Sequence, residues 1–387
     1  MVAAGRADKQ RIGTDFHVFW QAGYDFAHGL PLYQPLEGAR SFIYPPFAAQ
    51  VFQLLSLFPL KVSAWLFYMA SVCLIGVAAW LSRDIVARLR GQERRVVPLV
   101  LALLFSAEFL INNLDHVQVN LLVFVLCLLG VRAFLTQREA AAGGWIVAAT
   151  AIKLTPLFFA LWAVIRGNRR TLAAVAGFGV LALIFPMIQR GFPQGITDLR
   201  AYYQAFLHQF AAGAVVTNYR NQNLAAMVYR ALVPGSSGDT PPYDYAYLAS
   251  MEIWAPVVYR VLAGGILAVF LLHLIRLRTA AKPIGALEIA SVFLASHLLS
   301  GITWKAHLVT LLFVFYAFFS LRRERMSRAL RVPLLVAWGG IALVGLGRDV
   351  VGARVHHYLA GYSVFVWVML LLFGVSVRWS WAEVEWE

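Results

Sequence analysis

The sequence has few cysteines, few charged side chains and none of the familiar nucleotide or metal motifs. Cysteine occurs only at Cys73 and Cys127, each inside an apolar run, so we interpret both as small buried residues and expect no disulfide. Charged residues make up 13% of the chain, against roughly 25% in soluble domains. Walker loops, GxGxxG turns, HExxH and CxxC motifs are missing. ATP, NAD and zinc chemistry therefore have no support, and we expect no cofactor and no metal site; a need for a divalent ion stays open.

The chain is instead rich in apolar residues, since 60% of its 387 residues are hydrophobic. Short polar stretches separate apolar runs of about 17 to 22 residues, the length that crosses roughly 30 Å of hydrocarbon. We therefore predict one all-α integral membrane domain over residues 1–387, a polytopic helical bundle of about ten membrane segments. These lie near 62–81, 96–112, 117–135, 145–165, 171–188, 256–275, 284–303, 305–320, 332–348 and 358–378.

The net charge of +14 does not form one patch of the kind that binds nucleic acid. The basic residues lie in short loops between apolar runs, which is how membrane proteins fix their orientation. We expect all of these loops to be cytoplasmic and expect membrane lipids, not nucleic acid, as surroundings. The loops are 82–95, 132–144, 166–170, 276–283 and 321–331.

This orientation places 132–144 and 166–170 on the same side, although segment 145–165 separates them. The segment is therefore predicted to be re-entrant, with a break at Lys153-Leu154-Thr155-Pro156, where proline removes a backbone donor. Non-helical backbone at membrane depth is tolerated inside protein or beside a water-filled cavity. A cavity is therefore expected near Lys153.

The same orientation places two longer loops outside, an interfacial loop at 15–61 and an aromatic-rich loop at 189–255 expected to form a lid or cap. The stretch 1–14 is too short and polar for a signal peptide or membrane helix. The chain is therefore expected to begin after a missing helix, or else its N-terminal tail crosses the membrane without one.

An amphipathic interfacial helix is predicted over 15–30. Its apolar stripe comprises Phe16, Phe19, Trp20, Gly23, Ala27 and Leu30, opposite His17, Gln21, Asp25 and His28.

Polar residues at predicted membrane ends are the candidates for chemistry. Asp15 is either a helix cap or a general base. Lys153 needs an anion, because a lysine at the centre of a membrane helix costs about 2.5 to 3.5 kcal/mol; the partner is Glu108, Glu288 or a bound phosphate. Two clusters, 217–223 and 300–307, combine a cation with amides, hydroxyls or an imidazole, which suits a phosphate and sugar hydroxyls or simple interface anchoring.

Six motifs occur in an order that resembles the bacterial polyprenol-phosphate-mannose-dependent mannosyltransferases, within the GT-C class of membrane glycosyltransferases. They extend over nearly the whole chain: Asp15-Phe16 through Gly29 to Tyr33, then Tyr44-Pro45-Pro46, Gln118-Val119-Asn120, Lys153-Leu154-Thr155-Pro156, Asn221-Gln222-Asn223-Leu224 and Ser300 through His307. The chain departs from the family pattern at Val117, where glycine is usual, at Gly301, where proline is usual, and in lacking a first membrane helix.

The resemblance implies an inverting transfer of a hexose, mannose above all, from a polyprenyl-phosphate sugar to a lipid or glycan acceptor. The enzyme would act at the extracytoplasmic face of the bacterial cytoplasmic membrane. Asp15 would be the general base and His307 would assist, while Arg220, Lys305 and Lys153 would bind the donor phosphate. The implied substrate-binding residues are Tyr44, Gln118, Asn120, Asn221, Gln222 and Trp304.

Two other classes of protein fit the membrane segments. A transporter or lipid flippase would also use polar residues in a broken helix, but such proteins tend to have paired repeats with a site at the midplane. No repeat is found, and the polar clusters gather at one predicted face. A noncatalytic scaffold explains the helices but not Lys153 or the outer clusters.

Overall fold

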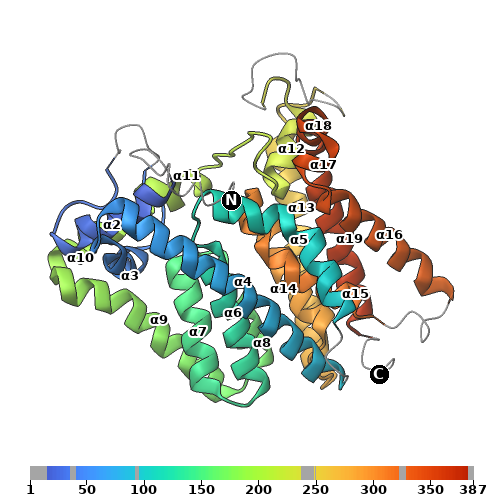
Figure 1. Cartoon of the computed structure of the whole chain (residues 1–387), viewed down its shortest axis with the longest axis horizontal. Helices are drawn as coiled ribbons and strands as arrows, with labels where there is room; N and C mark the ends of the chain where they lie inside the picture. The colour runs from blue at the N-terminus through green and yellow to red at the C-terminus, as the bar shows by residue number, and fades with distance from the viewer. Residues whose placement is uncertain are drawn as a thin grey trace. The chain divides into compact units, whose positions relative to one another are not determined.

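The computed structural model describes residues 15–34, 41–91, 96–236, 248, 250–321 and 328–381, and within them the chain is helical without a β-strand (Figure 1). The predicted all-α membrane fold is therefore confirmed. Parts of the stretches predicted from the sequence lie outside the described residues. These are the N-terminal stretch 1–14, residues 35–40 and 92–95, residues 237–247 and 249 of the aromatic-rich loop, and residues 322–327.

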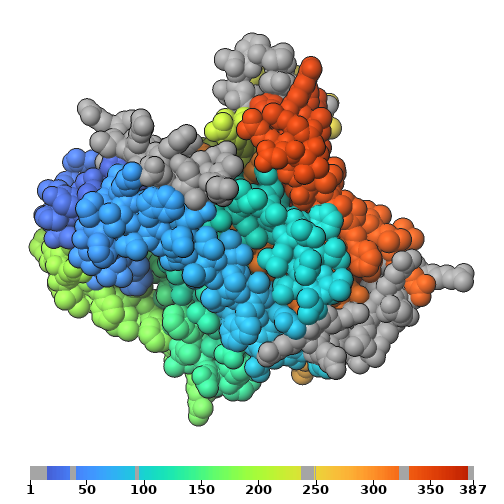
Figure 2. Space-filling view, in the orientation of Figure 1, coloured from blue at the N-terminus to red at the C-terminus, as the bar shows by residue number. Residues whose placement is uncertain are grey.

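Four helices of the described residues are long and apolar enough to cross a membrane: α4 (Leu60–Arg90), α5 (Val97–Asp115), α9 (Arg169–Arg190) and α13 (Ala255–Thr279). A fifth span results if α18 (Ala353–Gly361) and α19 (Val364–Trp379), which meet at a bend of 57°, count together. Large apolar side chains are exposed along α4, including Leu66, Met69 and Trp80, as contact with lipid requires. Figure 2 shows part of this helix, in blue, at the surface.

The other apolar helices are shorter than a full span. They are α6 (Asn120–Leu135), α7 (Glu139–Ile152), α8 (Leu157–Arg166), α14 (Ala286–Leu298), the 3₁₀ helix Lys305–Thr310 with α15 (Leu311–Phe319), and α16 (Arg328–Gly345). Each overlaps a predicted segment, with α7 and α8 sharing segment 145–165, whereas the count of about ten crossings stays a prediction.

The predicted loop 82–95 was wrong in its first part, because α4 continues to Arg90. Arg88 pairs with Asp84 one turn earlier at 2.7 Å, and Arg90 donates to the Ala317 carbonyl at 2.9 Å. Basic residues also suit the last turn of a helix, where the backbone dipole is negative. These interactions extend the helix beyond its apolar part.

Segment 145–165 breaks where the sequence predicts. Helix α7 ends at Ile152, Lys153 is extended with φ −150° and ψ 133°, and α8 begins after Pro156. Helix α7 starts at Glu139, so the predicted loop 132–144 shrinks to the short turn after α6. The break is confirmed, and re-entry of the segment stays a prediction.

The chain divides into two compact units, each described by itself. Unit 1 comprises 1–81 and 110–214, and unit 2 comprises 82–109 and 215–387. In unit 1, α2 (Asp15–Ala27) packs on α3 (Pro46–Ser56), α6 on α7, and α7 on α9. The first part of the predicted aromatic-rich loop 189–255 is helical and belongs to this unit. It forms α10 (Phe192–Tyr202), a π-helical turn (Tyr203–Leu207) and α11 (His208–Ala211).

The core of unit 2 is α14, whose thirteen residues are all buried. It packs against α15 and α19. Helix α12 (Leu224–Leu232) packs on α13, and the short α17 (Arg348–Val351) leads into α18. A helix buried on all sides explains why its sequence shows no amphipathic pattern.

The amphipathic helix predicted over 15–30 is α2, and its apolar stripe is mostly correct. Phe16, Phe19 and Gly23 are buried. Phe19 and Gly23 contact Phe52 of α3, and Phe16 packs near Phe67 of α4. His17 was placed on the polar side but is 8% exposed, and its ring stacks near Trp20. Leu30 was placed on the buried stripe but is 43% exposed. It lies beyond the helix, which ends before Gly29 with φ +71°.

The contact between α2 and α3 depends on Gly23. A Cβ atom there would overlap the backbone carbonyl of Phe52. We therefore expect Gly23→Ala to separate the two helices and to lower thermal stability in detergent, since overpacking costs roughly 1 to 3 kcal/mol. The control is Gly76→Ala in α4, where no atom lies within 4 Å of the added carbon. An alanine at Gly23 that melts at the same temperature as the control would contradict this packing.

Candidate functional site

Asp15 is joined to a turn far along the chain. It is the first residue of α2, and its Oδ2 accepts a hydrogen bond of 2.7 Å from Gln118 Nε2 in unit 1. The side chains of Asp15 and Gln118 are both only partly exposed. The carboxylate therefore takes part in a long-range contact, beyond any capping of its own helix.

The turn between α5 and α6 brings Gln118 to Asp15. Val117 has φ +48°, a left-handed conformation that is rare for a β-branched residue, and it is fully buried. The backbone N–H of Gln118 donates to the Asn113 carbonyl at 3.0 Å, and Asn113 Nδ2 donates to the Gln118 carbonyl at 3.0 Å. The position at which glycine is usual in the resembling family is thus one whose backbone favours glycine.

Lys153 and Asn120 form the second polar contact of unit 1. Lys153 Nζ donates to Asn120 Oδ1 at 2.6 Å, and Asn120 is 4% exposed at the start of α6. No described carboxylate forms an ion pair with Lys153, although Asp15 is close enough to attract it. The expected partner Glu108 pairs with Lys305 instead. Within the described residues, Lys153 therefore has an amide partner and neither of the two carboxylates considered, and a bound phosphate as its partner stays a prediction.

Tyr44 completes this group. Its ring lies 5.9 Å from Lys153 Nζ, within reach of a cation–π interaction. Tyr33 donates from its hydroxyl to the Tyr44 carbonyl at 2.7 Å, and the Tyr44 ring packs on Phe19 at 5.4 Å. We call the residues that meet here the unit 1 site: Asp15, Tyr44, Gln118, Asn120 and Lys153.

The unit 1 site keeps hydrogen-bonding capacity for a ligand. Among the described residues, Asn120 Nδ2 and Gln118 Oε1 are buried polar atoms without a protein partner. Buried polar groups are usually paired, with protein, water or ligand. A carboxylate, an ammonium group and two further amide atoms can together bind an anion and a hydroxyl group.

A second polar cluster lies within unit 2, around Lys305. Its Nζ is 2.9 Å from Glu108 Oε1 and 3.5 Å from His356 Nδ1. Arg220 and Arg348 also act on Lys305 electrostatically, so several cations gather near one carboxylate. His356 was not predicted from the sequence, and Glu108 was considered only as a partner of Lys153. The signal for Glu108 was its place inside an apolar helix.

The amides predicted to bind substrate in unit 2 serve the protein backbone. Asn221, which is 1% exposed, donates to the Val216 carbonyl at 2.7 Å and accepts from Thr303 N–H at 2.8 Å. Gln222, equally buried, donates to the Ala360 carbonyl at 2.8 Å. These bonds tie loop 215–223 to its neighbours. The exposed Arg220 beside them lies 5.5 Å from the Tyr219 ring.

Loop 299–304 leads into the short 3₁₀ helix that carries Lys305 and His307. His307 Nδ1 lies 3.3 Å from the Trp304 backbone nitrogen and 3.2 Å from the Ile302 carbonyl oxygen, so the imidazole contacts the turn before its own helix, and its tautomer decides which of the two it bonds. Both Trp304 and His307 have further partners. Their predicted roles toward substrate stay predictions.

Arg230 organises loop 215–223 and was missed from the sequence. It is fully buried, and its guanidinium donates to carbonyls of Thr217, Asn218 and Asn221 and to Ser363 Oγ, at 2.6 to 3.0 Å. Only its position on the strongly apolar face of α12 could have indicated a buried arginine.

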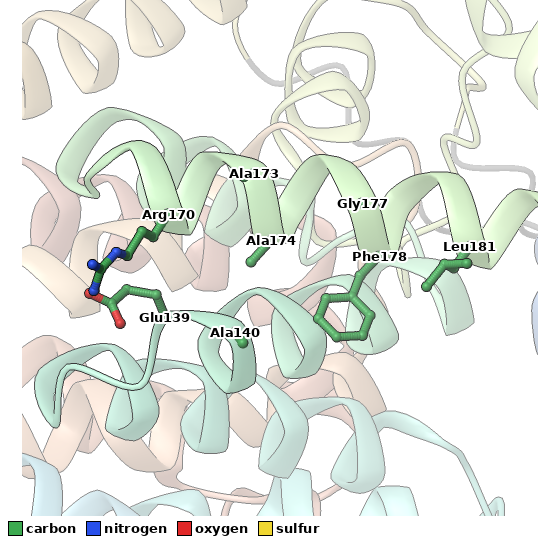
Figure 3. A pocket seen from close by; sticks show the side chains of 8 residues that line it. All are labelled: Glu139, Ala140, Arg170, Ala173, Ala174, Gly177, Phe178 and Leu181. Atoms are coloured by element: carbon green, nitrogen blue, oxygen red, sulfur yellow. The ribbon is translucent and has the colours of Figure 1, made fainter.

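A groove of about 510 Å³ lies between α7 and α9, near the end of α7 that is remote from Lys153. Figure 3 shows small and apolar side chains along it, with Glu139 and Arg170 at one end. It is distinct from the cavity expected near Lys153, which stays a prediction. Within the part of the chain that the structure describes, no three His, Cys, Asp or Glu side chains are grouped to hold a metal ion.

Comparisons with known proteins agree on one family. The model of glycosyltransferase family 87 matches residues 42–301. The chain is similar to the polyprenol-phosphate-mannose-dependent alpha-(1-2)-phosphatidylinositol pentamannoside mannosyltransferases of Mycobacterium tuberculosis, at 25% identity over 96% of this chain and 74% of that protein, and of Mycolicibacterium smegmatis, at 28% over 79% and 67%. A solved structure, ArnT from Cupriavidus metallidurans bound to undecaprenyl phosphate, aligns with a TM-score of 0.43 and 14% identity, over 99% of this chain and 75% of that one.

Replacing Arg230 tests whether its guanidinium holds loop 215–223. Arg230→Lys keeps the charge but loses the planar set of donors, which leaves several buried carbonyls unpaired. We expect a lower melting temperature and faster proteolysis within the loop. Arg260→Lys, at an exposed position of α13, is the matched control. Equal protease resistance of the two variants would show that the loop does not depend on Arg230.

Proposed function

Because the chain belongs to glycosyltransferase family 87, we propose that this membrane glycosyltransferase moves a hexose from a polyprenyl-phosphate sugar to a hydroxyl of a lipid or glycan acceptor. Mannose is the favoured sugar, since the similar mycobacterial enzymes are named for polyprenol-phosphate-mannose. The observation that carries the proposal is the contact of Gln118 with Asp15 beside Lys153. This group brings together the Asp15 carboxylate and the Lys153 ammonium group, and Lys153 has no carboxylate partner among the described residues.

Asp15 is the proposed general base. The acceptor oxygen attacks C1 of the sugar while Asp15 takes the hydroxyl proton, and the bond between C1 and the phosphate oxygen breaks. Polyprenyl phosphate leaves with the electron pair of that bond, and attack from the opposite side inverts C1. A positioned base of this kind contributes about 100- to 10,000-fold in rate.

Lys153 is the proposed cation for the leaving phosphate. It lacks a carboxylate partner among the described residues, whereas Lys305 already pairs with Glu108. Asn120 Nδ2 is a second donor at the same place, and Tyr44 lies over the ammonium group. Charge-assisted hydrogen bonds of this type are stronger where water is excluded.

The residues of unit 2 have narrower proposed roles. Arg220 and Lys305 remain candidates for binding the donor phosphate, and His307 for assisting the transfer. The side-chain amides of Asn221 and Gln222 bond to the protein backbone, so these two residues would act on substrate through the loops that they hold. Trp304 would likewise act through its loop. The site is proposed to face the extracytoplasmic side of the bacterial cytoplasmic membrane, opposite the basic loops.

A transporter or flippase is the second candidate, because the break between α7 and α8 carries a lysine, and broken helices form transporter sites. The two candidates differ in whether a glycosidic bond forms. The transfer assay below therefore separates them.

The first test compares Asp15→Asn with wild type in transfer of radiolabelled mannose from polyprenyl-phosphate-mannose to a membrane lipid extract. We expect the variant to be slower by about 100- to 10,000-fold while expression and melting temperature stay unchanged. Asp25→Asn, in the same helix, should transfer at close to the wild-type rate. A normal rate in Asp15→Asn would remove Asp15 as the base. Absence of transfer by wild type, with this or other polyprenyl-phosphate sugars, would favour the transporter.

A second test addresses Lys153. Lys153→Gln keeps a hydrogen-bonding side chain but removes the charge, so the KM for the polyprenyl-phosphate donor should rise about 10- to 100-fold. The KM for the acceptor should change little. Steady-state kinetics with each substrate varied in turn measure both values. An unchanged donor KM would assign the phosphate to another cation.

A further inference from the structure

We propose that Asn113 and Val117 are positioning residues, which set the backbone of Gln118 so that its amide fixes the Asp15 carboxylate for proton transfer. The inference rests on the proposed function, because it assumes that Asp15 is the base. It extends that function to two buried residues that touch no substrate. The α5–α6 turn thereby becomes part of the catalytic machinery.

Asn113 holds the main chain of Gln118 with two hydrogen bonds. Asn113 is fully buried in the last turn of α5. Its carbonyl accepts from Gln118 N–H, and its Nδ2 donates to the Gln118 carbonyl, both at 3.0 Å. The two bonds satisfy both backbone groups of Gln118, a residue that is only partly exposed. Asn113 therefore fixes the Gln118 backbone with its side chain at the carbonyl and with its own main chain at the N–H.

Val117 provides the change in direction that makes these bonds possible. Its φ of +48° occurs two residues after α5 ends at Asp115, and its N–H bonds back to the Leu114 carbonyl at 3.1 Å. A left-handed residue at this place is a common way to end a helix, but glycine is the usual choice. An uncommon conformation persists where the surroundings determine it, and such positions cluster at functional sites. The buried valine side chain supplies those surroundings.

One hydrogen bond connects Gln118 to Asp15. Gln118 Nε2 holds Oδ2 of Asp15 at 2.7 Å, and within the described ranges Oδ1 has no hydrogen-bond partner. A carboxylate fixed at one oxygen presents the other in a defined direction. Proton transfer requires that direction, since a base acts only within hydrogen-bond reach of the proton. A loose Gln118 would leave Asp15 free to rotate.

A purely structural role for Asn113 has a different signature. In that case its removal would destabilise the helix end whether or not residue 118 carries an amide. If Asn113 instead acts through Gln118, the effect of its removal on kcat should vanish once the Gln118 amide has gone.

The test is a double-mutant cycle on kcat, with wild type, Asn113→Ala, Gln118→Ala and the double variant in the mannose-transfer assay. We expect each single variant to lower kcat about 10-fold or more, because small misplacements at a reacting centre are costly. The donor KM should stay within about twofold for Asn113→Ala. In the Gln118→Ala background, Asn113→Ala should change kcat less than about twofold. Asn112→Ala, at the neighbouring half-buried position, is the control and should retain wild-type kcat.

Val117 provides a second measurement that does not require removal of Asn113. Val117→Ala and Val117→Gly both remove the buried isopropyl group, but only glycine adopts the positive φ without steric cost. We expect Val117→Gly to have the higher melting temperature and the higher kcat of the two. Equal values would overturn the role of the left-handed turn.

The outcomes separate this inference from the function on which it rests. Losses that multiply in the double variant, with an active wild type and an inactive Asp15→Asn, would overturn positioning through Gln118 and leave Asp15 as the base. An inactive wild type would overturn both. A kcat in Asn113→Ala equal to that of wild type would overturn the role of Asn113.

Discussion

Within unit 1, the site depends on polar side chains that find partners across long stretches of sequence in an apolar protein. Gln118 reaches Asp15 over 103 positions and Lys153 reaches Asn120 over 33. In such surroundings an unpaired donor or acceptor costs roughly 1 to 3 kcal/mol, so each bond restricts where the connected helices can lie. The close approach of α2 to α3 at Gly23 and the end of α7 before Lys153 are the conditions under which these bonds form.

The same constraint explains why the polar motifs lie at the ends of helices. A helix interior satisfies its own backbone, whereas its ends leave carbonyl and N–H groups that need partners. The turn at Val117, the extended Lys153 and the loop around Arg230 each supply such partners, and each presents side chains as a result. Ending a helix in apolar surroundings leaves backbone groups that need polar partners. The side chains that serve as those partners can also bind a polar substrate.

The sequence predicts the local features well and the pairings poorly. The break at Pro156, the buried Phe16, Phe19 and Gly23, and the family follow from patterns of a few residues. Other features depend on tertiary contacts. An amide partner for Lys153 was not expected, because its charge suggests an anion, either a carboxylate or a bound phosphate. The burial of Arg230 also depends on partners distant in sequence such as Ser363, which no local pattern reveals.

We propose that the unit 1 site binds the donor phosphate beside the base. A structure of the full chain with a non-hydrolysable polyprenyl-phosphate sugar bound would test this. We expect a phosphate oxygen about 3 Å from Lys153 Nζ and the anomeric carbon facing Asp15. A phosphate bound by other cations, with Lys153 still bonded only to Asn120 and Asp15 remote from the sugar, would contradict it.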